Sequence, residues 1–153
     1  MKKWVSLAAM LGIMALIFFL SAQPGESSGA LSESVADSMQ HSGAADLLLP
    51  AWFSANVYAN VRKWAHVYIY AALGAAAGMT ASFWLPDWTR SRQAGLAAAV
   101  CFAFAASDEC HQFFVPGRAM LFSDIGVDAL GFVPGILAAL LVLCLLQRRR
   151  KNQ

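Results

Sequence analysis

Long apolar segments separated by short polar ones run along the whole chain. At about 20 apolar residues for each membrane crossing, this pattern has room for four spanning helices. We expect them at residues 4–20, 61–85, 94–114 and 121–146. Gly74 and Gly78 in the second segment have the small-xxx-small spacing that lets another helix approach closely. The sequence therefore predicts an all-α membrane protein with a four-transmembrane-helix bundle.

The longest polar connection, residues 24–61, follows the first apolar segment. Within it, Leu31 and Val35 fall on one helical face, which predicts an extracytoplasmic loop carrying short interfacial helices. The first apolar segment also has a length that a signal peptide can have, and Ser21-Ala22 fits a cleavage site. We favour a retained first helix.

The composition supports a membrane protein without a separate soluble module. Hydrophobic residues make up 59% of the chain and charged residues 13%, whereas charged residues are about 25% of soluble domains. We expect one transmembrane domain over residues 1–147 and a basic cytoplasmic tail over residues 148–153. The three cysteines all fall within expected spans, where they are typical of packing residues rather than of a disulfide framework.

The basic residues predict how the chain is oriented. Four spans would bring the N-terminus, the turn at residues 86–93 and the tail to one side of the membrane. These segments hold eight of the cations: Lys2, Lys3, Arg90, Arg92, Arg148, Arg149, Arg150 and Lys151. Because Lys and Arg are enriched in cytoplasmic segments, we expect a multi-pass protein of the cell membrane with both termini in the cytoplasm.

Several ionisable side chains lie inside the apolar segments, near their predicted outer ends. A charged group at mid-bilayer costs roughly 2.5 to 3.5 kcal/mol on insertion scales, so a group of them indicates function. Spacings of three and four residues place them on shared helical faces. These faces hold Lys63, His66 and Tyr70 in one segment, Asp108, His111 and Gln112 in the next, and Asp124 and Asp128 in the last. We expect the three faces to meet in one outward-facing pocket.

Such a pocket has the groups that acid–base catalysis needs. An imidazole titrates near neutral pH and can act as a base, while a buried carboxyl group can act as an acid. The candidate catalytic residues are His66, Asp108, Glu109, His111, Asp124 and Asp128. Cations and neutral polar groups would hold a phosphate or carboxylate. The candidate substrate-binding residues are Lys63, Tyr70, Gln112 and Arg118. The expected substrate is an anionic amphiphile, either a membrane lipid or a lipid-linked envelope precursor, and the expected enzyme is a membrane-embedded hydrolase or transferase.

The same residues allow other interpretations. The protein could bind an envelope amphiphile without transforming it, or ion pairs from Arg118 to Asp108 or Asp124 could lock helices together. A proton or ion path is disfavoured because the predicted cytoplasmic halves lack polar residues. The ligand spacing matches no known metal site, so we expect no metal and no other cofactor. We expect no nucleic-acid partner, and the oligomeric state stays open.

Three blocks of the chain resemble the VanZ family, named for a teicoplanin-resistance protein. They read SAQPGESS from Ser21, RKWAHVYIYAALG from Arg62 and DECHQFFVPGRAMLFSDIGVDALGFVPG from Asp108. The family's characteristic positions correspond here to Lys63, His66, Tyr70, Asp108, Glu109, Gln112, Gly117, Arg118, Asp124 and Asp128. Ile69 stands where many members carry a Glu, so a mechanism that requires that carboxylate is not implied here. The resemblance implies an envelope-linked integral membrane protein and, by the family's name, a link to glycopeptide resistance.

Overall fold

The computed structural model describes residues 1–42 and 48–151, which form five helices and no strand. The helices are α1 (Lys2–Ser21), α2 (Gly25–Ser42), α4 (Val57–Trp84), α5 (Arg90–Gln112) and α6 (Phe122–Lys151). Residues 43–47 of the predicted loop and 152–153 of the predicted tail lie outside the described part of the chain. The predicted all-helical class is confirmed.

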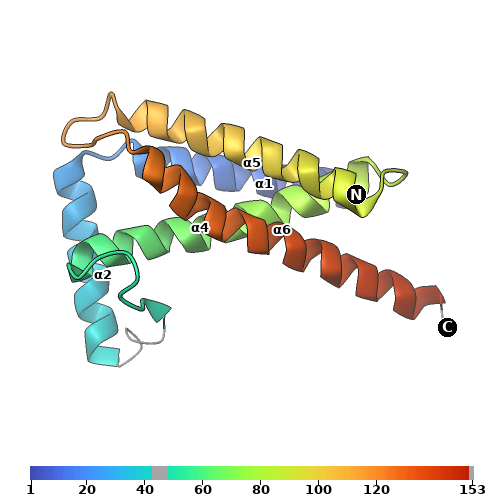
Figure 1. Cartoon of the computed structure of the whole chain (residues 1–153), viewed down its shortest axis with the longest axis horizontal. Coiled ribbons are helices and arrows are strands. Elements are labelled where there is room, and N and C mark those ends of the chain that lie inside the picture. Colours follow the sequence, from blue (N-terminus) through green and yellow to red (C-terminus); the bar gives the residue numbers. More distant parts are fainter. Residues whose placement is uncertain (43–47, 152–153) are drawn as a thin grey trace.

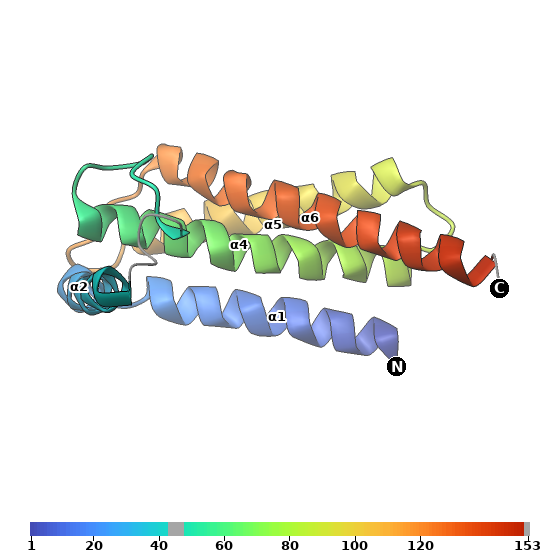
Figure 2. The same cartoon turned by 90° about the horizontal axis from the view of Figure 1, so that it is seen from below.

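Four of the helices, α1, α4, α5 and α6, run side by side along the molecule, and both chain ends lie at the same end of the bundle (Figure 1). Helix α2 crosses the opposite end at a steep angle to the others (Figure 2). Helix α4 is central, since it contacts all four other helices. This arrangement brings the end of α1, the start of α4, the end of α5 and the start of α6 together beside α2.

Three of these helices, α1, α4 and α6, are long and apolar enough to cross a membrane. Helix α5 is not among them, because polar residues occupy both of its ends. Helix α6 continues without a break into the basic segment that we predicted as a separate tail. The fourth span and the interfacial position of α2 therefore stay predictions.

Helices α4 and α6 pack backbone to backbone through glycines. A Cβ atom on Gly74 would collide with the backbone oxygen of Phe132, and one on Gly131 with that of Val67. The close approach predicted from the small-residue spacing in α4 is confirmed. It places the polar starts of α4 and α6 next to each other.

Candidate functional site

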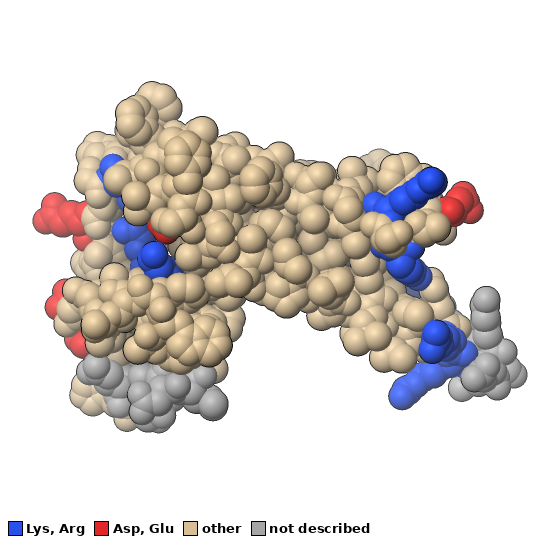
Figure 3. Space-filling view, in the orientation of Figure 1, with Lys and Arg blue, Asp and Glu red and all other residues tan. Residues whose placement is uncertain are grey.

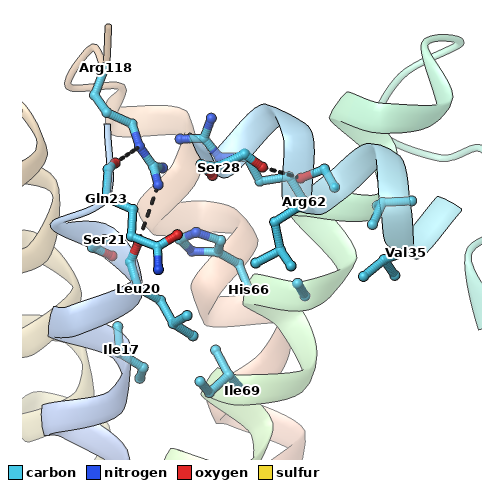
Figure 4. Close-up of a pocket in the computed structure, with 14 residues that line it drawn as sticks. Ile17, Leu20, Ser21, Gln23, Ser28, Val35, Arg62, His66, Ile69 and Arg118 are labelled. Atoms are coloured by element: carbon cyan, nitrogen blue, oxygen red, sulfur yellow. Dashed lines mark hydrogen bonds between the residues drawn. The ribbon is translucent and has the colours of Figure 1, made fainter. Parts of the chain in front are cut away.

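Two cavities lie at the end of the bundle where α2 crosses it. The first, of about 220 Å³, lies between α1, α2 and α4, and half of the residues that line it are aliphatic (Figure 4). The second, of about 230 Å³, lies between α4, α6 and the turn that joins α5 to α6. We call them the apolar cavity and the polar cavity. Arg62, His66 and Arg118 line both of them, so the two cavities are neighbours that share a wall.

His66 is held by a carboxylate from the facing helix. Its Nδ1 atom lies 3.0 Å from Oδ1 of Asp128, whose side chain is 0% exposed. The glycine contacts between α4 and α6 make this approach possible. A carboxylate acceptor at Nδ1 favours the tautomer with the proton on that atom, which leaves Nε2 free to accept one.

The turn after α5 is tied to the end of α1 through Arg118. Its Nε atom donates to the backbone oxygen of Gln23 at 3.3 Å and its Nη2 atom to that of Leu20 at 3.4 Å. Gly117, with φ of +74°, makes the turn, and Gly25 approaches it so closely that a Cβ there would collide with the Gly117 oxygen. The backbone nitrogen of Gly25 donates to the oxygen of the residue before Gly117. Gln23 and Gly25 both belong to the SAQPGESS block, so this block has a structural role: its backbone holds the turn and Arg118 in place.

A buried polar network lies behind the cavities and centres on Gln112. Its Nε2 atom donates to Asp108 at 3.1 Å and to Glu109 at 3.3 Å, and its Oε1 atom accepts from Arg118 at 3.3 Å. Ser21 donates to the same Asp108 oxygen at 2.9 Å. The network joins α1, α5 and the turn, and it keeps Asp108 and Glu109 away from direct contact with either cavity.

The cations of the polar cavity differ in how they are neutralised. Lys63 pairs with Asp124 at 3.5 Å, which joins α4 to α6. Within the described residues, neither Arg62 nor Arg118 forms an ion pair with a carboxylate. The alternative in which Arg118 pairs with Asp108 or Asp124 is not found among the described residues, because backbone oxygens and Gln112 occupy its donors. Two guanidinium charges face the cavities without a carboxylate partner.

The structure gathers most of the predicted site residues, at different distances from the cavities. Those that line a cavity are Lys63, His66, Gln112, Arg118 and Asp124. Those that lie behind the lining, and are buried, are Tyr70, Asp108, Glu109 and Asp128. His111 is the exception, because its ring stacks on Phe18 of α1 with centroids 4.4 Å apart and lines neither cavity.

Arg62 is a site residue that we did not select from the sequence. It lines both cavities, and no hydrogen bond or ion pair joins it to another described residue. The sequence does contain evidence for it, because Arg62 lies four residues before His66 and therefore on the same helical face. Its neighbour Lys63, and not Arg62, is the position that the resemblance implies.

The described part of the chain contains no group of three or more His, Cys, Asp or Glu side chains that could hold a metal ion. Four buried side-chain atoms have no hydrogen-bond partner among the described residues: Tyr70 Oη, Asp108 Oδ1, Asp128 Oδ2 and His111 Nε2. Buried polar atoms are usually satisfied, by protein groups or by ordered water, so each of these atoms has room for a further partner.

Three helices long and apolar enough to cross a membrane, with charged groups gathered at the two ends of the molecule, are typical of a helical membrane protein (Figure 3). The chain matches the VanZ/LLP1 family over residues 6–144, nearly its whole length, and it belongs to that family. The resemblance seen in the three sequence blocks is confirmed. No curated protein and no solved structure matches the chain.

Proposed function

We propose that the protein recognises an anionic amphiphile of the cell envelope, holding its head in the polar cavity and its chain in the apolar cavity. The observation that supports this most is the shared wall: Arg62, His66 and Arg118 line both cavities. A molecule with a charged head and an apolar chain is the kind of ligand that two such neighbouring cavities suit.

The polar cavity has the chemistry for an anionic head. Arg62, Lys63 and Arg118 line it, and only Lys63 has a carboxylate partner among the described residues. A guanidinium offers two parallel donors to a phosphate or carboxylate, and hydrogen bonds between charged partners are about twice as strong as neutral ones. An anion placed there would neutralise charge that the protein itself leaves unpaired.

The apolar cavity suits a hydrocarbon chain. Its aliphatic lining comes from three helices and includes Ile17, Leu20, Leu31, Val35, Val61 and Ile69. Figure 4 shows Ile17, Ile69 and Val35 on the sides of this cavity away from Arg118. Each buried CH₂ group contributes roughly 0.8 kcal/mol. The chain of a lipid would therefore add to binding on the side away from the charges.

In the arrangement that we propose, α5 is a fourth span and the site faces the outside of the cell membrane. Lys and Arg gather at the two ends of the molecule and leave the middle of the displayed face free (Figure 3). The end with both termini holds Lys2, Lys3, Arg90 and Arg92 against the single acid Asp87. The positive-inside rule then makes that end cytoplasmic and lays α2 on the outer surface. A part in glycopeptide resistance is a proposal that rests on family resemblance alone.

Thermophoresis of the detergent-solubilised protein can test the proposed function, with short-chain phosphatidic acid compared with phosphatidylcholine of the same chains. We expect phosphatidic acid to bind at least tenfold more tightly. Arg118→Gln should weaken its binding about tenfold or more, since a charge-assisted hydrogen bond contributes roughly 1.5 to 3 kcal/mol. Arg92→Gln, an equal change of charge at the opposite end, should leave binding unchanged. Equal affinity for the two lipids, or equal effects of the two variants, would overturn the proposal.

One observation favours a second candidate, a purely structural role for the polar residues. Two contacts between ionisable side chains of the described residues, the Lys63–Asp124 ion pair and the His66–Asp128 hydrogen bond, join α4 to α6. If they serve only to lock these helices, substituting them lowers membrane abundance and thermal stability without selectively changing lipid affinity. The thermophoresis experiment separates the two roles once abundance is measured beside affinity.

A further inference from the structure

We propose that this site hydrolyses a phosphate monoester head, with His66 as the general base and Asp128 as the residue that positions it. The inference rests on the proposed function, because it assigns a reaction to the amphiphile bound there. It extends that function from recognition to chemistry and narrows the anionic head to one class.

The charges of the polar cavity favour a monoester. Lys63 is neutralised by Asp124, which leaves the guanidinium groups of Arg62 and Arg118 without a carboxylate partner among the described residues. A phosphate monoester carries about −1.5 to −2 charges near neutral pH. A phosphodiester or a carboxylate carries one charge, so it would bring a directly bound counter-charge to only one of the two guanidinium groups.

The position of His66 suits a general base. Among the histidines of the described chain, only His66 lines either cavity, and it lines both. Its Nδ1 atom is engaged by Asp128, so Nε2 is the ring nitrogen left to accept a proton. Figure 4 shows the imidazole reaching from α4 toward the side of the cavity where Arg118 lies, with the Gln23 side chain between them. Because His66 and Arg118 line the same two cavities, a head bound to the guanidinium would share a cavity with the free nitrogen.

Water is the nucleophile that the surroundings leave available. Three serines line the apolar cavity, Ser21, Ser28 and Ser32. The Ser21 hydroxyl donates to Asp108, and the Ser32 hydroxyl donates to the backbone oxygen of Ser28. None of the three lines the polar cavity, where the head would be held.

The reaction is a balanced hydrolysis. His66 Nε2 takes a proton from water while the water oxygen forms a bond to phosphorus. The bond between phosphorus and the ester oxygen breaks, and its electron pair goes to that oxygen. A solvent water on the opposite side of phosphorus gives a proton to the leaving oxygen, and the imidazolium returns its own proton to the solvent, so the products are an alcohol and inorganic phosphate. Asp128 stabilises the imidazolium between the two proton transfers, and Arg62 and Arg118 stabilise the phosphoryl oxygens.

Release of inorganic phosphate tests the inference, with the purified protein in phosphatidylcholine vesicles that contain phosphatidic acid. We expect release from phosphatidic acid and none from phosphatidylglycerol, which is a diester. His66→Asn is the decisive variant, because its amide can replace Nδ1 toward Asp128 but has no atom in the place of Nε2. We expect it to lower kcat by about 10² or more while lipid affinity stays within a few-fold. His41→Gln, on α2 and outside both cavities, is the control and should leave release unchanged.

Asp128→Asn is a second test variant. The Asn amide oxygen can still accept from the His66 imidazole, but it no longer stabilises the charge of the imidazolium. We expect it to lower kcat with little change in KM. If phosphatidic acid binds and no phosphate is released, the hydrolytic inference is overturned and the recognition proposal stands. Should His66→Asn keep full release, His66 is not the base. If the unaltered protein does not bind phosphatidic acid, both proposals are overturned.

Discussion

At the scale of single residues, the site separates groups that face a ligand from groups that hold them. Arg118 faces both cavities, while the oxygens of Leu20 and Gln23 fix its direction. His66 faces both cavities, while the fully buried Asp128 fixes its ring. Arg118 and His66 are therefore held in position by the fold before any ligand is present.

Ile69 offers a direct test of the apolar cavity, because it lines that cavity and stands three residues beyond His66. Ile69→Glu would place a carboxylate among aliphatic side chains, where an uncompensated charge is strongly disfavoured. We expect affinity for long-chain phosphatidic acid to fall about tenfold or more, and affinity for inorganic phosphate to fall much less. Thermophoresis with both probes measures this. Ile69→Leu, which keeps the volume, should bind like the unaltered protein, and equal losses for the two probes would contradict an apolar chain site.

Which residues belong to the site was predictable in part. Spacing of three and four residues correctly brought Lys63, His66 and Asp124 to one place. The same reasoning put His111 there, but its ring stacks on Phe18. Residues three apart share only a broad helical face, and the rotation of α5 against α1 decides which side of that face meets the cavity. That rotation depends on packing between helices, which a local pattern does not contain.

At the scale of elements, pairs of segments that are distant in sequence are joined by glycine contacts. Gly131 and Gly74 let α6 lie directly on α4, while Gly25 lets the start of α2 meet the turn at Gly117. The first contact sets the distance between His66 and Asp128. The second contact sets the position of the neighbouring Arg118.

Two glycines of α2 make a matched pair for testing the second contact. A Cβ on Gly25 would collide with the Gly117 oxygen, whereas one on Gly29 has nothing within 4 Å. We expect Gly25→Ala to displace the turn and to weaken phosphatidic acid binding about tenfold. Gly29→Ala should bind normally and gain a little stability, because Ala is the better helix former by about 1 kcal/mol. Affinity and thermal unfolding of both variants check this, and normal binding by Gly25→Ala would show that the turn does not position the cation.

The predicted helix boundaries differ from those in the structure by a few residues. The second apolar segment was expected from Val61, but α4 begins at Val57 because the Asn56 side chain accepts from the nitrogens of Tyr58 and Ala59. Asn is a preferred N-cap residue, but Asn56 lies before the apolar segment from which the helix was predicted. Helix α2 is one element over Gly25–Ser42, in the part of the loop where short helices were expected.

At the scale of the whole molecule, function depends on which end faces outward and on whether α5 crosses the membrane. Three helices meet the length and hydropathy of a span, and α5 runs beside them in the bundle (Figure 2). A helix packed along three spans would have its polar ends in the two interfaces.

Reporter fusions can decide this arrangement. Alkaline phosphatase fused at Ala119 should be active, because the enzyme folds only outside the cytoplasm, and fused at Ser91 it should be inactive. A fusion at Ser38 on α2 should be active like that at Ala119. Equal activity at Ser91 and Ala119 would mean that α5 does not cross, while the reverse pattern would turn the site toward the cytoplasm.

The two guanidinium groups that lack a carboxylate partner have one more consequence. Both groups line the same two cavities, so an anion that binds between them stabilises the fold by mass action, by about 2.7 kcal/mol when its concentration is a hundred times its Kd. The heat resistance of the purified protein should therefore depend on the lipids that remain with it, so that thorough delipidation would yield a weaker fold from the same polypeptide.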